Sequence, residues 1–389
     1  MILKKRIIYF HQSRLGYHLE FNLIMKVCHV INTLNRGGAE THLLDLVKEQ
    51  NNRGYAISLV VIGSDNPNII SLENEFINLE IQIKRLNGPR MFNLRSYMKL
   101  HRFINENNYN VVHSHQPRSD FMMHILKKFS GNFKWIVSVH GKYDTYLEST
   151  KLSNRLKKKF MISLAGYWDQ ADTIIAISDS VSEWIVNLNS NLEPKVIPYW
   201  VEQNNLNSNY STKEDITIGF LGRINKNKGI EDLLEVFNNL DENNLNLVIG
   251  GHADEQYLEY LNSISQQTKK ESIKYLGYVE NRKLFFDEID IFIFPSFSEG
   301  LGLVLLEAMS FSKICVTRDI PPMNNYLNLD SGYLFTDNTT MLNSLNEAIQ
   351  DMRKDKNKIK SKLFSIEEVV KNASVASIFP LLEQVYNYE

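Results

Sequence analysis

The chain alternates between short apolar runs and segments in which hydrophobic residues recur with the period of an amphipathic helix. Apolar runs of strand length, rich in valine and isoleucine and bounded by turn residues, predict buried β-strands. In the first half these runs lie at 27–31, 57–62, 81–86, 111–115, 135–140, 173–177 and 195–198. In the second half they lie at 216–221, 245–249, 273–276, 289–294, 314–317 and 332–335.

Helical periodicity fills most of the intervals between these predicted strands. The helices are expected at 40–50, 96–105, 119–129, 155–168, 180–188, 230–237, 256–266, 303–309 and 341–352. Strands that alternate with helices form parallel sheets whose two faces are both covered. The pattern therefore predicts an α/β fold with two tandem doubly wound, Rossmann-like domains.

The length of 389 residues suits two domains of ordinary size. The polar, asparagine-rich stretch 202–215 predicts a linker between an N-terminal domain at 25–201 and a C-terminal domain at 216–389. The last helix of the C-terminal domain is a candidate to cross back to the N-terminal domain. Residues 1–24 start with basic residues, but polar side chains from His11 to His18 interrupt any apolar core of a signal peptide. This segment is expected to be a poorly ordered leader.

Charge divides unevenly between the two halves. Residues 1–200 carry 25 Lys and Arg against 17 Asp and Glu, a net charge of +8, whereas residues 201–389 carry 18 against 28, a net charge of −10. This asymmetry indicates two domains with different partners, with chance surface composition as the alternative. No run approaches the roughly 18 apolar residues of a membrane span. Cys28 and Cys315 lie in separate apolar runs, which predicts reduced core cysteines in a cytoplasmic protein.

The stretch 290–309 holds a buried strand, a Gly-x-Gly turn and an amphipathic helix, with glutamates at Glu299 and Glu307. A strand that feeds a helix through such a turn gathers unpaired backbone N–H groups where phosphate binds well. Carboxylates accept hydrogen bonds from sugar hydroxyls. The combination predicts a nucleotide-sugar site. In the alternative interpretation the turn is an ordinary feature of a doubly wound fold, Glu299 is an acid at the helix N-terminus that the helix dipole stabilises, and Glu307 is a solvated helix residue.

Two further loops follow predicted first strands. Arg223 and Lys228 lie in the loop 222–229, where a guanidinium and an ammonium can clamp a diphosphate. Gly37 and Gly38 open the first helix and let the backbone approach a bulky anion. The loop lacks the full Gly-x-Gly-x-x-Gly spacing, so it gives little support to a dinucleotide site.

Histidines close two strands of the basic half, as His113 and His115 on one strand and His140 on another. Two histidines at i, i+2 share one face of a strand and could bind a metal, but no Asp, Glu or Cys stands at ligand spacing, so no metal is predicted. A partner for a sugar hydroxyl or a proton-handling group fits better. His113 has the alternative of being a packed strand residue.

These motifs together resemble a retaining nucleotide-sugar glycosyltransferase of family four, with the GT-B architecture of two doubly wound domains that face each other across a cleft. The resemblance runs from about Met25 to the C-terminus. It rests on the Gly-Gly-Ala-Glu loop at 37–40, His-x-His at 113–115, Ile-Ser-Asp-Ser at 177–180, Gly-Arg-x4-Lys-Gly at 222–229 and the stretch 295–308 around the paired glutamates.

The resemblance implies a role for each matching position. Arg223 and Lys228 would hold the diphosphate, whose cradle the backbone of Gly300, Leu301, Gly302 and Leu303 and the Gly37-Gly38 loop would complete. Glu299 would bind the transferred sugar and Glu307 the ribose. His115 would face the sugar and the acceptor, with His140 also on the acceptor side, and Tyr278 and Val279 would flank the base. The catalytic set is then Glu299, His115, Arg223 and Lys228.

The same resemblance implies transfer without a covalent intermediate, in which the leaving diphosphate takes the acceptor's proton and the two cations stabilise its charge. A UDP- or GDP-sugar is the expected donor, with no cofactor and no metal. The segment 321–325 lacks the acidic residue often found in the family, which leaves the donor's identity open.

Two basic stretches with interleaved apolar residues, 84–102 and 151–168, are candidates for an anionic membrane surface, with solvated helices as the alternative. No nucleic-acid motif is present. The expected function is sugar transfer to a glycan or lipid-linked glycan acceptor in cell-surface polysaccharide synthesis (lipopolysaccharide or capsule), in the cytoplasm or at the inner face of the plasma membrane. The alternatives are a nucleotide-sugar 2-epimerase and a non-catalytic binding protein.

Overall fold

The computed structural model describes residues 12–13, 16–17, 24–67, 69–86, 93–129, 133–143, 163, 166–204, 212–241, 244–253, 257–259 and 273–387. The chain divides into two compact units, Met1–Ile136 and Val137–Glu389, and each is considered by itself.

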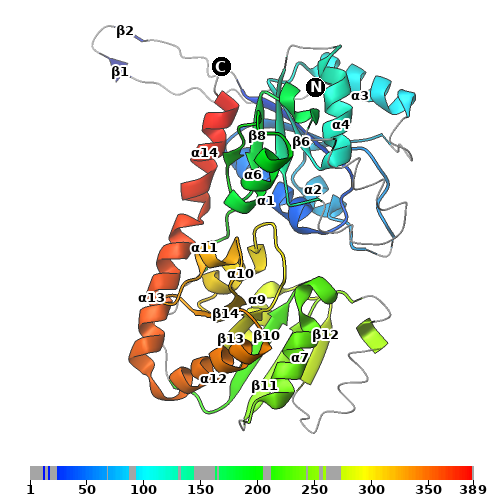
Figure 1. Cartoon of the computed structure of the whole chain (residues 1–389). Coiled ribbons are helices and arrows are strands. Elements are labelled where there is room, and N and C mark those ends of the chain that lie inside the picture. Colours follow the sequence, from blue (N-terminus) through cyan, green and yellow to red (C-terminus); the bar gives the residue numbers. More distant parts are fainter. Residues whose placement is uncertain are drawn as a thin grey trace. The chain divides into compact units, whose positions relative to one another are not determined.

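The first sheet is parallel and has the strand order β5-β4-β3-β6-β7-β8-β9 (Figure 1). Its strands are β3 (Lys26–Ile31), β4 (Ala56–Val61), β5 (Gln82–Arg85), β6 (Val111–His115), β7 (Lys134–Val139), β8 (Thr173–Ala176) and β9 (Lys195–Val196). In β3 every residue after Lys26 is buried, as expected of a strand covered on both faces. The helices of the first unit are α1 (Gly38–Asn52), α2 (Glu73–Asn78), α3 (Leu94–Asn107) and α4 (Pro117–Lys127).

The second sheet is also parallel and has the order β12-β11-β10-β13-β14-β15. Its strands are β10 (Ile216–Leu221), β11 (Leu245–Gly250), β12 (Ile273–Gly277), β13 (Ile291–Phe294), β14 (Ile314–Arg318) and β15 (Tyr333–Phe335). The second unit contains the helices α6 (Asp179–Leu188), α7 (Ile230–Asn239), α9 (Arg282–Glu288), α10 (Leu303–Ser310), α11 (Met323–Tyr326), α12 (Asn338–Lys354), α13 (Lys356–Asn372) and α14 (Val375–Asn387), and the 3-10 turns η3 (Trp168–Gln170) and η4 (Lys226–Lys228).

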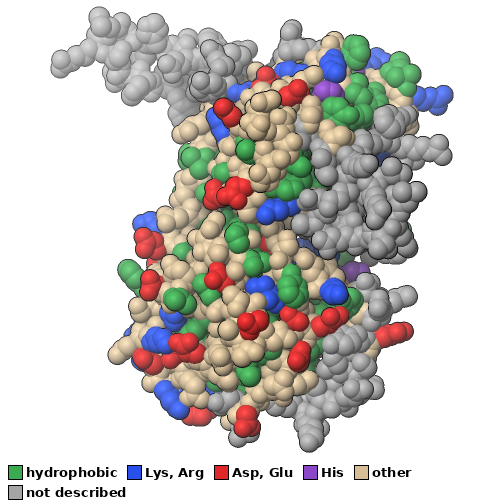
Figure 2. Space-filling model, in the orientation of Figure 1, with side chains coloured by type: hydrophobic (Ala, Val, Ile, Leu, Met, Phe, Trp, Pro, Cys, Tyr) green, Lys and Arg blue, Asp and Glu red, His purple; other side chains and the backbone are tan. Residues whose placement is uncertain are grey.

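Several phenylalanines stack on one another in the core of the second sheet. Phe286 stacks on Phe311 with ring centroids 4.9 Å apart, and Phe292 stacks on Phe294 at 5.7 Å. Helix α10 packs against β13 and β14, while α7 and α12 pack on each other (Figure 1). Acidic and basic side chains are interspersed over the drawn face of this part (Figure 2). The core therefore fixes the carboxyl ends of β10 and β13, from which the candidate site is built.

In each sheet the order of strands reverses direction at one place, between β3 and β6 in the first and between β10 and β13 in the second. In open α/β sheets, ligands bind at such switch points, outside the carboxyl ends of the strands. The loops at 222–229 and 295–302 leave the two strands that flank the second switch point. The fold thus places two of the predicted loops together.

The predicted α/β class with two parallel, doubly wound sheets is confirmed, and each predicted strand matches an observed one to within two residues at either end. Both cysteines are free and buried, as predicted, and burial raises the pKa of each thiol. The predicted helices at 155–168 and 256–266 lie almost entirely outside the described residues, as do most of the leader 1–24 and the central part of the linker. Among the helices in the described ranges, none has the length and apolar character needed to cross a bilayer.

Candidate functional site

Lys228 and Glu299 form an ion pair at the switch point of the second sheet, although 71 residues separate them. The backbone N–H of Phe297 donates to the carbonyl of Asn227 at 2.9 Å, and the Asn227 side chain donates to the carbonyl of Ser298 at 3.1 Å. Gly229 turns the chain into α7 with a φ of +66°, where a Cβ would lie 2.4 Å from the carbonyl oxygen of Pro295. These bonds and this close approach hold the two loops against each other.

The pair is partly buried, with side-chain exposures of 18% for Lys228 and 11% for Glu299. The Lys228 ammonium also lies 5.6 Å from the centre of the Phe294 ring, within the range of a cation–π contact. Desolvation strengthens the interaction of such charges with a ligand. An ammonium and a carboxylate side by side can serve a phosphate and a sugar hydroxyl respectively.

Arg223 lies in the same loop as Lys228 but is exposed, and it makes no hydrogen bond or ion pair with any described residue. Its guanidinium is therefore available to an anion that enters from solvent. Of the two predicted cations, Lys228 forms an ion pair with Glu299, whereas Arg223 forms none with the described residues.

The Gly-x-Gly turn leads into α10 as predicted. Gly302 is the N-cap of α10 with a φ of +78°, a left-handed conformation that favours glycine, and no side chain caps the helix. The first N–H groups of a helix have no partner within it. Ser178 donates its hydroxyl to the carbonyl of Gly300 at 2.6 Å, which fixes the turn that precedes Leu301 and Leu303. The turn keeps the geometry of an anion cradle.

Glu307 points from α10 to an ion pair with Arg282, the first residue of α9. Sequence reasoning missed Arg282, because nothing in the sequence around it marks its partner 25 residues away. Tyr278 follows β12 and is 40% exposed, whereas Val279 is partly buried and packs toward Gly250. The predicted ribose carboxylate thus has a cationic partner from the element that follows the predicted base-binding segment.

Two buried polar atoms near these strand ends have no hydrogen-bond partner among the described residues: the hydroxyl of Ser296 and the side-chain carbonyl of Asn225. Arg318 anchors the same loop, because its Nε donates to the carbonyl of Pro295 at 3.1 Å and its Nη2 donates to the Asp232 carboxylate at 3.0 Å. Buried polar groups normally have partners. The two unpaired atoms of Ser296 and Asn225 are therefore consistent with a site that receives a polar ligand.

In the first unit, Gly37 is the N-cap of α1, and a Cβ on it would lie 2.6 Å from the Glu40 carboxylate. That carboxylate accepts a hydrogen bond of 2.5 Å from the side-chain amide of Gln116, and the side-chain oxygen of Gln116 accepts from the backbone N–H of Asn32 at 3.2 Å. Gln116 has a φ of +103°, an unfavourable conformation for a residue other than glycine. The switch point between β3 and β6 is therefore bridged by a strained residue that the sequence did not indicate.

His113 and His115 are joined by a third histidine, His29, on the neighbouring strand β3. His29 Nδ1 lies 2.9 Å from His115 Nε2, and His29 Nε2 lies 2.8 Å from the Gln50 side-chain oxygen. All three rings are buried, and ligand atoms of the three lie within 4.8 Å of one another. The sequence pattern did not indicate His29, because His29 lies next to His113 and His115 only when β3 pairs with β6 in the sheet.

Three histidines at such distances could ligate a metal ion. Burial lowers the pKa of His29 to about 4, and both of its ring nitrogens already contact other side chains. We interpret His29 as a neutral imidazole that is hydrogen-bonded to both His115 and Gln50, with the His113 ring packed beside it.

In the second unit, His140 follows β7 and its Nδ1 contacts the hydroxyl of the buried residue Tyr199. Burial lowers the pKa of His140 to about 3, so its imidazole is neutral at physiological pH. The direction of the hydrogen bond between this Nδ1 and the Tyr199 hydroxyl depends on the tautomer of the neutral ring. Tyr199 is a second contact that sequence reasoning missed.

Two family models match consecutive parts of the chain. Residues 36–203 match the model described as Glycosyltransferase Family 4, and residues 201–363 match the model described as Glycosyl transferases group 1.

Relatives of known role share this similarity over most of their length. The chain is 24% identical over 305 residues to the capsular polysaccharide biosynthesis glycosyltransferase CapH of Staphylococcus aureus, covering 76% of this chain and 82% of the relative. It is 21% identical over 310 residues to the O-antigen biosynthesis glycosyltransferase WclY of Escherichia coli, covering 76% and 81%. It is 26% identical over 305 residues to a Campylobacter jejuni α-1,4-N-acetyl-D-galactosaminyltransferase that acts on a GalNAc-containing, undecaprenol-linked glycan, covering 75% and 78%.

Solved structures share the fold at low identity. Sucrose-phosphate synthase from Thermosynechococcus elongatus superposes with a TM-score of 0.74 at 16% identity, covering 93% of this chain and 98% of that one. Anabaena HepE in complex with UDP and glucose gives a TM-score of 0.72 at 16% identity, covering 93% and 99%. With two consecutive glycosyltransferase models on two doubly wound domains, the chain is a glycosyltransferase of the GT-B fold.

Proposed function

We propose that the protein transfers a sugar from a nucleoside-diphosphate donor to a glycan or lipid-linked glycan, with retention of configuration. The observation that carries this proposal is the Lys228–Glu299 pair at the switch point between β10 and β13, next to the uncapped N-terminus of α10. A cation, a carboxylate and free N–H groups at one place suit a phosphate that carries a sugar.

The residues at the switch point of the second sheet have proposed parts in binding the diphosphate and the sugar of the donor. Arg223 and Lys228 hold the diphosphate together with the backbone from Gly300 to Leu303, with a further contribution expected from the loop of Gly37 and Gly38. Glu299 accepts hydrogen bonds from hydroxyls of the transferred sugar.

The nucleoside end of the donor has its own proposed contacts. Glu307, supported by Arg282, accepts from the ribose hydroxyls. Tyr278 and Val279 flank the base, for which the exposed Tyr278 ring offers a stacking surface. UDP- and GDP-sugars are the expected donors. HepE was solved with UDP and glucose, which is consistent with a donor of this class.

The proposed transfer is a front-face displacement. The bond between the sugar's anomeric carbon and the β-phosphate oxygen breaks, while the acceptor oxygen bonds to that carbon from the same face. The acceptor's hydroxyl proton passes to the leaving diphosphate, whose growing negative charge Arg223 and Lys228 stabilise. Two cations and the N–H groups of α10 can serve the diphosphate without a divalent metal. His115 and His140 are proposed on the acceptor side.

The acceptor class is suggested by the relatives. Two act in capsule and O-antigen synthesis, and a third elongates an undecaprenol-linked glycan. By this analogy the protein acts in cell-surface polysaccharide synthesis, in the cytoplasm and in peripheral contact with the inner face of the plasma membrane. Neither family model describes an epimerase, so that alternative is not carried further.

A panel of UDP-, GDP- and ADP-sugars, each added to the purified chain in a thermal unfolding assay, tests donor binding. A true donor raises the midpoint by mass action, and its parent nucleoside diphosphate does so as well. The stabilising donor is then incubated with a lipid-linked glycan, and the product's anomeric configuration is read by NMR. Stabilisation by no nucleotide sugar would reject the donor site, and an inverted product would reject retention.

A further inference from the structure

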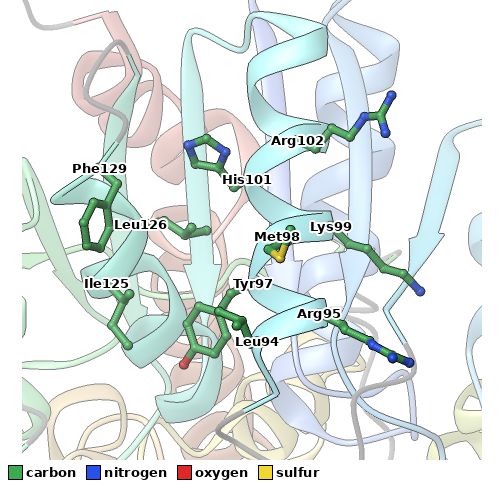
Figure 3. A pocket seen from close by; sticks show the side chains of 10 residues that line it. All are labelled: Leu94, Arg95, Tyr97, Met98, Lys99, His101, Arg102, Ile125, Leu126 and Phe129. Carbon is green, nitrogen blue, oxygen red and sulfur yellow. The ribbon is translucent and has the colours of Figure 1, made fainter.

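We propose that a surface formed by α3 and α4 docks the protein onto an anionic lipid bilayer. This α3–α4 surface consists of α3 from Leu94 to Arg102 together with Ile125, Leu126 and Phe129, which line a groove of about 870 Å3 (Figure 3). The inference rests on the proposed function, because a lipid-linked acceptor requires the enzyme to work at a bilayer.

The apolar side chains of this surface are unusually exposed. Leu94 is 74% exposed, Met98 64% and Phe129 78%, and all three line the same groove. Single exposed hydrophobic residues are ordinary, but a contiguous group of large ones marks a binding surface. The group comes from α3 and from the turn after α4, so it is a composite patch that no single sequence segment displays.

Helix α3 presents three distinct faces. Tyr97, Leu100 and Ile104 are buried, and Leu94 and Met98, at i and i+4, form the exposed apolar stripe. A third stripe consists of Arg95, Lys99 and Arg102, displaced from the apolar stripe by one residue, or about 100° around the helix axis. In Figure 3 these three basic side chains extend from α3 away from α4, whereas Ile125 comes from α4 and Phe129 from the turn that follows it.

The charges of the surface are almost all positive. Arg95 and Lys99 are exposed and form no ion pair with any described residue, and Arg102 pairs only with the exposed Glu106 at 2.6 Å. The other acidic residue of the two helices, Asp120, is buried and accepts from Ser114. Blue cationic and green hydrophobic side chains lie next to each other over α3 and α4 in Figure 2.

A bilayer fits this combination better than the other occupants of an apolar groove. Apolar side chains enter the boundary between headgroups and acyl chains, while long basic side chains reach the lipid phosphates beside them. A second copy of this chain, meeting the surface symmetrically, would bring the same cations together without a compensating charge. A nucleic acid would bind the cations through its phosphates but would offer no apolar contact to Leu94 and Phe129.

The test is flotation of the full chain with vesicles of phosphatidylcholine alone and of phosphatidylcholine mixed with phosphatidylglycerol. We expect binding to the anionic vesicles only, and weaker binding as the salt concentration rises. Each cation near an anionic surface contributes about a 5-fold gain in binding, so Arg95→Gln with Lys99→Gln should weaken it roughly 30-fold. Leu94→Ser with Phe129→Ser should weaken it at least about 10-fold, through lost apolar burial.

The chain offers matched controls for both double variants. Leu329 and Phe364 are 72% and 73% exposed on the second unit, so Leu329→Ser with Phe364→Ser removes the same side-chain types from elsewhere. Lys356 and Lys360 are exposed on α13 at the same i, i+4 spacing as Arg95 and Lys99. Both control pairs should float like the original chain. All variants are checked for an unchanged thermal midpoint, so that unfolding is not mistaken for lost docking.

Several outcomes would overturn the proposal. They are failure to float with anionic vesicles, flotation equal in the surface variants and their controls, or loss of binding only when Lys157, Lys158 and Lys159 are reversed. A concentration-dependent dimer in light scattering that the Leu94 and Phe129 variant abolishes would assign the surface to a second copy. Nucleoside-diphosphate binding is measured in parallel: if it is intact while flotation fails, the docking surface is wrong and the proposed function stands.

Discussion

Lys228 and Glu299 neutralise each other at the carboxyl ends of β10 and β13. In the proposed donor complex, a diphosphate and a sugar meet an ammonium and a carboxylate whose loops are already joined by the hydrogen bond from the Phe297 N–H to the Asn227 carbonyl. The loops therefore need little reorganisation to bind a donor, because each charge is held in position by the other. The Glu299 carboxylate also competes with the diphosphate for Lys228. Because of this competition, mutation of Glu299 and mutation of Lys228 should affect nucleotide binding differently.

Removal of either predicted cation should slow transfer while the fold survives. Lys228→Ala or Arg223→Ala is expected to cost about 3 kcal/mol of transition-state stabilisation, the scale of one lost oxyanion donor. Lys226 lies in the same loop and is exposed, so Lys226→Ala is the matched control and should keep its activity. The measurement is kcat/KM with the stabilising donor, together with the thermal midpoint. Near-normal turnover in both Lys228 and Arg223 variants would remove the diphosphate assignment.

Glu299→Gln should separate binding of the nucleotide from transfer of the sugar. The variant loses the carboxylate that competes for Lys228, so affinity for the free nucleoside diphosphate should stay unchanged or rise. Transfer should fall by roughly 10- to 100-fold, the value of a hydrogen bond to a charged group. Calorimetry gives the affinity and a product assay gives the rate, with the exposed Glu280→Gln as control. A large loss of nucleoside-diphosphate affinity in Glu299→Gln would show that this carboxylate contacts the nucleotide.

The strands were the most predictable part of the structure. The run at 111–115 became β6 and the run at 216–221 became β10 without a shift, because β-branched apolar residues open both runs and every residue of the two strands except Thr217 is buried. The helices at Glu73–Asn78 and Arg282–Glu288 were missed because they are short. Helix α13 is not among the predicted helices, because lysines are interspersed along it and obscure the buried stripe of Ile359, Leu363 and Ile366.

The site was predictable only where one segment carries several of its residues. The stretch around Glu299 and Gly302 displays a strand, a turn and a helix in order, and the resemblance to a known family drew on that order. His29, Arg282 and Tyr199 carry no local mark, because each acts through a partner brought near by the fold. The φ of +103° at Gln116 is likewise a property of the folded backbone that no residue type announces.

The Arg282–Glu307 pair predicts a second phenotype, opposite to that of Glu299. Glu307→Gln should weaken the binding of the free nucleoside diphosphate by roughly 10- to 100-fold, because the ribose belongs to that ligand. Arg282→Gln should have a smaller effect, roughly 5-fold or less, because the guanidinium is 38% exposed and acts through Glu307.

A double-mutant cycle tests this coupling. If Arg282 works by orienting Glu307, the double variant should bind about as weakly as Glu307→Gln alone. Lys283, the next residue of α9, pairs with Asp287 instead, so Lys283→Gln is the control and should bind normally. Unchanged affinity in Glu307→Gln would reject the ribose assignment, and simple additivity would reject the supporting role of Arg282.

The buried imidazole of His29 predicts a loss of stability in mild acid. Burial lowers its pKa from 6.5 to about 4 in the folded chain, so between these values the unfolded chain binds more protons than the folded one. The stabilisation present above pH 6.5 is therefore lost as the pH falls toward 4, by on the order of 1 to 2 kcal/mol between pH 7 and pH 5. Urea unfolding of the original chain and of His29→Gln at both pH values measures this loss of stability.

His29→Gln should lose less stability on acidification than the original chain, whereas the control His252→Gln, at an exposed histidine, should lose as much as the original chain. An equal acid loss in the original chain and His29→Gln would mean that His29 keeps an ordinary pKa in the folded protein.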